Sequence, residues 1–186
     1  MRKLSHDEIV ARQISFQPAS RFPVSALLNN VRSLYNVGSI FRTADGARLS
    51  KLYLCGYTGF PPARKVLKTS LGATETVPWQ RHACAVECAR ELKQQGVSIV
   101  LLEQTDRSEP FDQAAFSYPL CLVVGNEIEG IDPELVKLAD QSIEIPMYGV
   151  KNSLNVAIAF GIAAFHLIGQ YQKFVSPPLM GGVRGG

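Results

Sequence analysis

Short apolar segments alternate with stretches of helical periodicity along most of this chain, and this order constrains the fold more than any single motif. Strands are predicted at 24–29, 52–55, 74–77, 97–102, 120–124 and 142–146, and helices at 5–13, 36–49, 81–95 and 153–172. Short buried strands that alternate with helices are typical of a mostly parallel sheet with helices on both faces. A chain of 186 residues is long enough to bury a core in such a fold. We therefore predict an α/β fold of this kind.

Breaks in this pattern divide the chain into three predicted parts. Residues 1–22 form an N-terminal extension with a short helix, which Pro18 and Pro23 separate from the rest. Residues 23–172 form the α/β domain. Residues 173–186 form a tail rich in proline and glycine, which we expect to be flexible.

Charge and hydropathy limit the surfaces with which the protein could bind nucleic acid or a membrane. The formal net charge is +3, so a surface that binds nucleic acid has to be a local patch. The N-terminus has no apolar signal-peptide core, and the purely apolar residues 156–165 fall well short of the roughly 20 residues that a bilayer requires. We expect a cytoplasmic protein without a membrane segment, in which residues 153–172 form a helix buried on most sides.

The cysteines could be metal ligands or core residues. They are Cys55, Cys84, Cys88 and Cys121. Cys84 and Cys88 would share one face of a helix, but no second ligand pair or histidine stands at zinc-finger spacing. The sequence favours small core residues, reduced thiols and no metal.

Three polar stretches that contain glycine, 29–38, 125–130 and 146–155, each come directly after a predicted strand. Ligands of parallel α/β sheets bind beyond the carboxyl ends of the strands. We therefore expect the three stretches to meet at one ligand site.

The second stretch, Gly125-Asn-Glu-Ile-Glu-Gly130, has glycines at the spacing of a phosphate loop. Such a loop continues with Lys and Ser or Thr, whereas Ile131 and Asp132 follow here, and Glu127 and Glu129 would repel phosphate. No G-x-G-x-x-G occurs either, which disfavours a dinucleotide cofactor. The stretch is either a tight strand-to-helix turn alone or a loop for a ligand that is cationic or rich in donors.

The third stretch, Ile145-Pro-Met-Tyr-Gly-Val-Lys-Asn-Ser-Leu-Asn-Val156, precedes the last predicted helix. Ser153 is predicted to be the N-cap of that helix. Asn155 then falls in the first turn, where backbone N–H groups are still free to bind a ligand. With Asn152 close by, the cluster holds more polar side chains than a cap needs.

These stretches together resemble the SpoU (TrmH-like) RNA ribose methyltransferases of the SPOUT superfamily. The first family motif, N-x-G-x-x-x-R-T, matches Asn36 to Thr43, and the second, G-x-E-x-x-G, matches Gly125 to Gly130. The third, I-P-M-x-G-x-x-x-S-L-N-V, matches Ile145 to Val156. Order and spacing agree, and the resemblance covers about residues 23–172.

The resemblance implies an RNA methyltransferase that uses S-adenosylmethionine to methylate a ribose 2′-hydroxyl in tRNA or rRNA. It also implies a deep trefoil knot formed by the C-terminal segment and a homodimer whose active site spans the interface. Carried over by position, the cofactor-binding residues are Leu102, Glu103, Gln104, Gly125, Asn126, Glu127, Ile145, Pro146, Met147, Ser153 and Leu154.

The same resemblance assigns a catalytic role to Arg42. Family members are thought to use the matching arginine as the base, assisted by an RNA phosphate, but a guanidinium stays protonated in proteins. We therefore expect Arg42 to clamp the phosphate next to the target ribose bidentately, while the proton leaves through that phosphate or water. The alternative is a surface pair with Asp45.

Other matched residues are expected to support Arg42. Glu127 would hold its guanidinium, and Gly38 would leave room for the RNA backbone. The residues expected to orient the ribose or Arg42 are Asn36, Ser153 and Asn155.

Basic side chains extend the expected RNA surface: Arg32, Arg42, Arg64, Lys65, Lys68, Arg81 and Lys151. The alternative for each is a solvated basic face. If they bind phosphates, the affinity for RNA falls steeply with salt.

Two other classes of function compete with an enzyme. An RNA-binding or ribosome-associated factor without activity would not need to keep Asn36, Arg42 and Glu127 together. A doubly wound nucleotide-binding protein would need the lysine or the glycine fingerprint that the chain lacks. The sequence therefore favours the methyltransferase.

Overall fold

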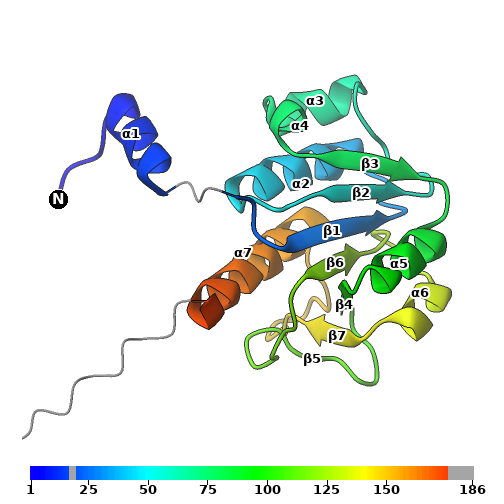
Figure 1. Cartoon of the computed structure of the whole chain (residues 1–186). Helices are drawn as coiled ribbons and strands as arrows, with labels where there is room; N and C mark the ends of the chain where they lie inside the picture. The colour runs from blue at the N-terminus through cyan, green and yellow to red at the C-terminus, as the bar shows by residue number, and fades with distance from the viewer. Residues whose placement is uncertain (17–19, 176–186) are drawn as a thin grey trace, which may run out of the picture.

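One parallel sheet organises the protein (Figure 1). The computed structural model describes residues 1–16 and 20–175. Within these residues the sheet has the strand order β3-β2-β1-β6-β4-β7-β5, and every neighbouring pair is parallel. Its strands are β1 (Val24–Asn29), β2 (Leu52–Cys55), β3 (Trp79–His82), β4 (Ser98–Leu102), β5 (Glu109–Pro110), β6 (Leu120–Val124) and β7 (Gln141–Glu144). The predicted α/β fold is confirmed, with a sheet that is wholly parallel.

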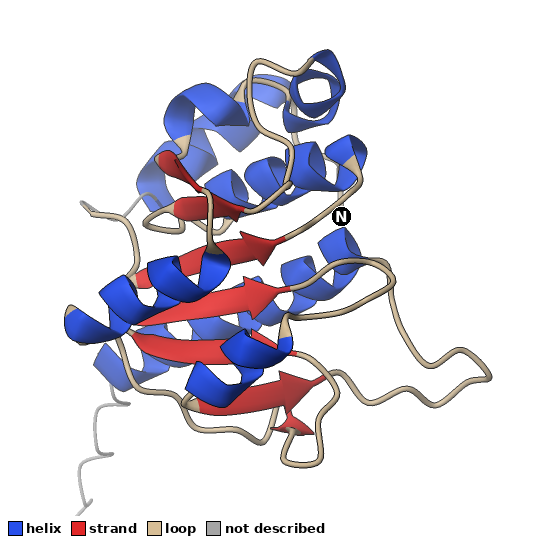
Figure 2. Cartoon of the chain, turned by 90° about the vertical axis from the view of Figure 1, so that its right-hand side faces the viewer, coloured by secondary structure: helices blue, strands red, loops and turns tan. Residues whose placement is uncertain are grey.

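Helices cover both faces of the sheet, as predicted (Figure 2). The helices are α1 (His6–Phe16), α2 (Leu34–Gly46), α3 (Arg64–Ser70), α4 (Ala73–Thr76), α5 (Ala85–Gln94), α6 (Pro133–Leu138) and α7 (Val156–Val175). On one face α2 and α7 bury Phe41 and Phe160 completely against the sheet. On the other face α5 and α6 bury Leu92 and Leu135.

The prediction was wrong around β3. Residues 74–76 belong to helix α4 rather than a strand, with Val77 as its C-cap, and Arg81, expected to begin a helix, lies in β3. The strand is placed by long-range contacts, because Trp79 packs edge-on against Phe41 and β3 pairs with β2. Helix α5 begins only at Ala85.

Capping side chains set the starts of α2 and α7. Helix α2 begins two residues earlier than predicted because the hydroxyl of Ser33 accepts a hydrogen bond from the backbone N–H of Asn36 at 3.4 Å. Helix α7 begins at Val156, so the prediction of Ser153 as its N-cap is wrong. Asn155 takes that role, since its Oδ1 accepts from the N–H of Ala157 at 3.0 Å.

The predicted boundaries of the two chain ends need revision. The first helix is confirmed but extends to Phe16. Helix α7 reaches Val175, so the first residues of the predicted tail are helical, while residues 176–186 and Pro18 lie outside the described residues. None of the helices that the structure describes combines the length and the apolar character needed to cross a membrane.

The thiols belong mainly to the core on the α5 side. Cys55, Cys88 and Cys121 are buried, whereas Cys84 is half-buried at the start of α5. Burial raises the pKa of the Cys121 thiol to about 12, which keeps it protonated. Within residues 1–16 and 20–175, no three His, Cys, Asp or Glu side chains are grouped in a way that could hold a metal.

Candidate functional site

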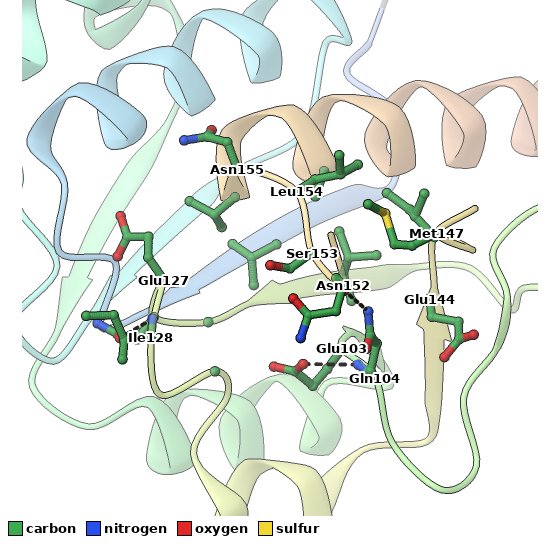
Figure 3. A pocket seen from close by; sticks show the side chains of 18 residues that line it. Glu103, Gln104, Glu127, Ile128, Glu144, Met147, Asn152, Ser153, Leu154 and Asn155 are labelled. Carbon is green, nitrogen blue, oxygen red and sulfur yellow. Dashed lines mark hydrogen bonds between the residues drawn. The ribbon is translucent and has the colours of Figure 1, made fainter. Parts of the chain in front are cut away.

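A pocket of about 540 Å³ lies beyond the carboxyl ends of β4, β6 and β7 (Figure 3). We call it the strand-end pocket. Every residue predicted to bind the cofactor lines it, except Pro146. Its full lining is Leu102, Glu103, Gln104, Val124, Gly125, Asn126, Glu127, Ile128, Gly130, Glu144, Ile145, Met147, Asn152, Ser153, Leu154, Asn155, Val156 and Ala159. Of the three stretches expected to meet at one ligand site, 125–130 and 146–155 line this cavity, whereas no residue of 29–38 does.

The turn of the second motif is tightly closed. Asn126 and Gly130 exchange two backbone hydrogen bonds of 3.0 Å. A Cβ atom at Gly125 would lie 2.5 Å from the carbonyl oxygen of Gly130, and Gly130 itself has a φ of +72°. Both glycines are thus required by the backbone of the turn.

The side chain of Asn126 fixes this turn to its surroundings. Its Oδ1 accepts from the N–H groups of Ile128 and Glu129 at 2.8 and 2.9 Å. Its Nδ2 donates to the carbonyl of Asn30 at 3.0 Å and to the hydroxyl of Tyr57 at 2.9 Å. All four of its hydrogen-bonding positions are used, so this wall of the pocket is already in place.

Glu127 connects the turn to the start of α2. Its carboxylate accepts from the backbone N–H groups of Arg32 and Ser33 at 2.9 and 3.0 Å, and from Nδ2 of Asn36 at 2.8 Å. Burial disfavours the charged carboxylate, but these hydrogen bonds outweigh burial and lower the pKa of Glu127. The charge also compensates the free N–H groups at the helix start.

Asn36 and Asn155 complete the connection to the third motif. Nδ2 of Asn155 donates to Oδ1 of Asn36 at 3.1 Å, while Oδ1 of Asn155 caps α7. The amide orientations are mutually consistent, since Asn36 donates to Glu127 with its other end. We call this chain of contacts the Glu127–Asn36–Asn155 bridge, and it joins all three motifs.

Arg42 does not take part in the bridge. Its side chain is exposed on α2 and forms no hydrogen bond or ion pair with any residue that the structure describes. The prediction that Glu127 holds Arg42 is wrong within one chain, because the carboxylate is occupied by the start of α2. The alternative pair is not formed either, since Asp45 accepts from the hydroxyl of Thr76 at 2.7 Å.

The predicted role of Gly38 is also wrong. Gly38 is buried, and a Cβ atom there would overlap the hydroxyl of Thr69 and the carbonyl of Val66 in α3. The glycine therefore permits close packing of α2 against α3, and it leaves no space for RNA.

The opposite wall of the strand-end pocket holds the predicted Glu103 and Gln104 and also Glu144, which the sequence analysis missed. Glu103 accepts from the N–H groups of Gln104 and Ile131 at 3.0 and 3.1 Å. Nε2 of Gln104 donates to the carbonyl of Asn152 at 2.6 Å (Figure 3). Glu144, the last residue of β7, also lines the pocket. Its position near the end of a predicted strand was the sequence signal that could have indicated a place in the pocket.

The predicted RNA-binding side chains are all exposed, but they do not gather at one place. Arg64 and Lys68 lie on α3, Lys151 lies in the segment before α7, and the guanidinium of Arg81 lies 4.5 Å from the ring centroid of Phe60. Arg32 and Lys65 line a second pocket of about 470 Å³. We call it the helix-start pocket, and its lining is Arg32, Ser33, Leu34, Tyr35, Asn36, Lys65, Glu127 and Ile128.

Comparisons with known proteins agree with this geometry. Residues 23–165 match the model of the SpoU rRNA Methylase family. The tRNA (guanosine(18)-2′-O)-methyltransferase of Aquifex aeolicus is 35% identical over 141 residues, which are 74% of this chain and 64% of that protein. The chain spans slightly less than two thirds of the length of several curated relatives that it matches.

Solved structures share the fold. The A. aeolicus TrmH/SpoU tRNA modifying enzyme superposes with a TM-score of 0.77 at 29% identity, covering 91% of this chain and 85% of that one. The AdoMet-bound rRNA methyltransferase from Sinorhizobium meliloti gives a TM-score of 0.71 at 30% identity, covering 81% and 56%. With the family match over most of its length and its three motifs joined by the Glu127–Asn36–Asn155 bridge, this chain belongs to the SpoU rRNA Methylase family.

Proposed function

We propose that this protein transfers a methyl group from S-adenosylmethionine to a ribose 2′-hydroxyl of RNA, with tRNA or rRNA as the substrate class. The observation that carries this proposal is the Glu127–Asn36–Asn155 bridge, which joins the first family motif to the two motifs that line the strand-end pocket. The A. aeolicus relative is named a tRNA 2′-O-methyltransferase, and the S. meliloti structure is AdoMet-bound.

The pocket suits this cofactor in size and chemistry. Its volume of about 540 Å³ lies within the usual range of small-molecule sites. The carboxylates of Glu103, Glu127 and Glu144 favour a ligand with positive charge, while Leu102 and Leu154 offer apolar contact to an adenine ring. Bound there, S-adenosylmethionine supplies an electrophilic methyl group on a sulfonium.

The residues of the chain align the ribose with this methyl group. The 2′-oxygen forms a bond to the methyl carbon as the carbon–sulfur bond breaks, and the hydroxyl proton leaves to the neighbouring phosphate or to water. Ser153 is suited to bind the ribose, because its hydroxyl lines the pocket without a hydrogen bond to any described residue. Asn155 is held in place by Asn36, so it orients the site rather than moving with substrate. Glu127 stays ionised, since its pKa is lowered, and acts as a positioning residue.

Arg42 is assigned to the phosphate next to the target ribose, in the pocket of a second copy. Arg42 follows Asn36 by six residues, about 240° around the helix, so it points away from the pocket that Asn36 serves. Helix α7, which packs against α2, exposes an apolar stripe formed by Ile158, Ile162 and Phe165. The ring of Phe165 reaches α2 at Gly46, next to Arg42. A homodimer through this stripe would bring each Arg42 close to the other copy.

The path of the third motif supports a trefoil knot. After β7 the chain runs past Gln104, which binds the carbonyl of Asn152, and then returns to α2 through the contact of Asn155 with Asn36. A chain that leaves β7, next to the edge strand β5, and comes back across the ends of β4 and β6 in this way is consistent with the knot of the family.

Calorimetry with S-adenosylhomocysteine tests the cofactor site. We expect binding to the purified protein, and methyl transfer from labelled S-adenosylmethionine to total RNA of a strain in which the gene is deleted. Mapping the 2′-O-methyl marks that this strain lacks would identify the nucleotide. Absence of cofactor binding would contradict the enzyme. RNA binding with no methyl transfer would instead support a factor that has lost activity.

Light scattering tests the dimer. We expect the wild type to have the mass of two chains and Ile158→Glu to have the mass of one, since a carboxylate in the stripe would be buried without a partner. Ile14→Glu is the matched control, because Ile14 is an exposed isoleucine on α1. A monomeric wild type would show the dimer proposal to be wrong.

A further inference from the structure

The helix-start pocket has no role in the chemistry described above, although it adjoins the strand-end pocket. Glu127 and Ile128 line both cavities. Figure 3 shows these two side chains at the end of the strand-end pocket opposite Gln104 and Glu144. A ligand in one pocket therefore lies beside a ligand in the other.

The lining of this pocket combines an aromatic ring with cations. Tyr35 is 44% exposed, and Nζ of Lys65 lies 5.8 Å from the centroid of its ring. Arg32 and Lys65 form no ion pair with any carboxylate in the described parts of the chain. An exposed aromatic ring beside unpaired cations is how proteins bind a base and its phosphate in single-stranded nucleic acid.

The anion must be recognised by these side chains and not by the helix start. The backbone N–H groups of Arg32 and Ser33 are already occupied by the carboxylate of Glu127. That carboxylate repels a phosphate from its own side of the pocket, so the phosphate is directed to the side of Lys65 and the Arg32 guanidinium.

The walls of the pocket are held in place before any ligand arrives. The hydroxyl of Thr69 in α3 donates to the carbonyl of Tyr35 at 3.0 Å, and Gly38 lets α3 approach α2 closely. This packing sets Lys65 of α3 beside Tyr35 of α2. On the other side Leu34 is anchored, because its side chain fills the space over Gly59.

We propose that the helix-start pocket binds one nucleotide next to the methylated one, with Tyr35 stacking on its base and Lys65 and Arg32 binding its phosphate. This inference rests on the proposed function, because it takes the neighbouring strand-end pocket as the place of the target ribose. It assigns to α2 a second contact with the substrate, separate from Arg42. Since stacking accepts every base, the pocket sets the position of the strand more than its sequence.

Two substitutions at Tyr35 test the stacking. The probe is total RNA from the deletion strain, and the affinity is measured by filter binding in the presence of S-adenosylhomocysteine. We expect Tyr35→Ala to weaken RNA binding by about 5- to 150-fold, the usual effect of losing one stacked base. Tyr35→Phe keeps the ring and should bind like the wild type. The affinity for S-adenosylhomocysteine should be unchanged in both variants.

Lys65→Gln tests the phosphate contact independently, in case Tyr35→Ala disturbs α2. We expect weaker RNA binding and a slope of log affinity against log salt that is smaller by about 1. Lys137→Gln is the control, because Lys137 is exposed on α6 at the other face of the sheet. Its slope should equal that of the wild type.

The outcomes separate this proposal from the proposed function. If the wild type methylates RNA but Tyr35→Ala and Lys65→Gln bind RNA normally, the pocket proposal is wrong and the enzyme stands. If Tyr35→Phe binds as weakly as Tyr35→Ala, the hydroxyl rather than the ring is needed, and stacking is overturned. If the wild type binds no S-adenosylhomocysteine, the enzyme is wrong, while the RNA-binding measurements still decide the role of Tyr35.

Discussion

The first turn and the middle of α2 hold their functional side chains in opposite ways. At the start, Asn36 is fixed between Glu127 and Asn155 by hydrogen bonds of 2.8 and 3.1 Å. Six residues further on, the side chain of Arg42 is exposed and has no partner among the residues that the structure describes. The same helix thus carries one preorganised residue and one that is free to move.

This difference shows which parts of the site a single chain holds in position and which parts need a ligand or a second copy. The bonded side chains shape the strand-end pocket before a ligand arrives, so changing them should cost stability as well as activity. Arg42 gains a defined position only from a phosphate or a second copy, so changing it should cost activity alone. Variants on the two sides of this comparison should therefore differ in how much stability they lose.

The largest effect is expected for Arg42→Lys. A lysine keeps the charge but loses the bidentate fork, so the phosphate is held less well and turnover should fall by about 100-fold or more. Single-turnover methyl transfer to RNA of the deletion strain measures this. The melting temperature and the affinity for S-adenosylhomocysteine should not change, because no internal contact is lost.

Arg90→Lys is the control for this variant, since Arg90 is exposed on α5 at the opposite face of the sheet. It should keep normal turnover. Near-normal turnover of Arg42→Lys as well would show that bidentate geometry is irrelevant, and the role given to Arg42 would be wrong.

Among the residues held by internal contacts, Gly125→Ala should cause the largest loss of stability. Its Cβ would lie 2.5 Å from backbone atoms of Gly130 and Ile131, so the turn must open, at a cost of about 1–3 kcal/mol in the free energy of unfolding. Binding of S-adenosylhomocysteine should weaken with it, because the turn is a wall of the pocket. Urea unfolding and calorimetry measure the two effects.

Gly149→Ala is the matched control in the third motif. A Cβ atom at Gly149 would have nothing within 4 Å, so the free energy of unfolding should change by less than about 0.5 kcal/mol. Equal losses in both variants would mean that the two loops are held equally firmly, contrary to the hydrogen bonds around Asn126.

The sequence predicted the centre of the sheet better than its edge. Strands β1, β2 and β6 were predicted with the bounds that the structure shows, because a parallel strand covered on both faces is a continuous apolar run. At the edge, residues 74–77 have the residue types of a strand, but residues 74–76 lie in α4 and Val77 is its C-cap. The packing of Trp79 on Phe41 outweighed local propensity there.

The sequence also predicted which residues meet at the site better than how they meet. The second and third motifs located the pocket because each follows a strand end. The contacts of Asn36 span 91 residues to Glu127 and 119 residues to Asn155, so they depend on the strand order, which no local pattern contains. For the same reason the sequence wrongly predicted that Gly38 makes room for RNA, whereas it allows α3 to pack closely against α2.

Two substitutions at Asn155 separate its cap from its place in the bridge. Asn155→Ala removes both contacts and should lower the free energy of unfolding by about 0.5–2 kcal/mol. Asn155→Asp keeps an oxygen to cap α7 but no longer donates to Asn36, so it should be nearly as stable as the wild type yet slower in methyl transfer. Thermal unfolding and turnover are compared for the pair. If the aspartate is as unstable as the alanine, the bridge and not the cap holds the start of α7.

The smallest expected effect is the pH dependence of the free energy of unfolding that comes from Glu127. The pKa of Glu127 is lowered in the folded protein, chiefly because its hydrogen bonds from Arg32, Ser33 and Asn36 outweigh burial, so the native state binds its proton less readily than the unfolded state. The stabilisation is therefore complete above the unfolded pKa of about 4.3 and is lost as the pH falls through the lower folded pKa. Because the side chain is largely exposed, we expect a few tenths of a kcal/mol. The measurement is the difference in the free energy of unfolding between wild type and Glu127→Gln from pH 7 down to pH 3, in which the titration of all other carboxylates cancels. A difference that stays constant over this range would mean that the charge of Glu127 does not stabilise the start of α2. The contrast between a fixed helix start and a free Arg42 side chain would then not depend on this carboxylate.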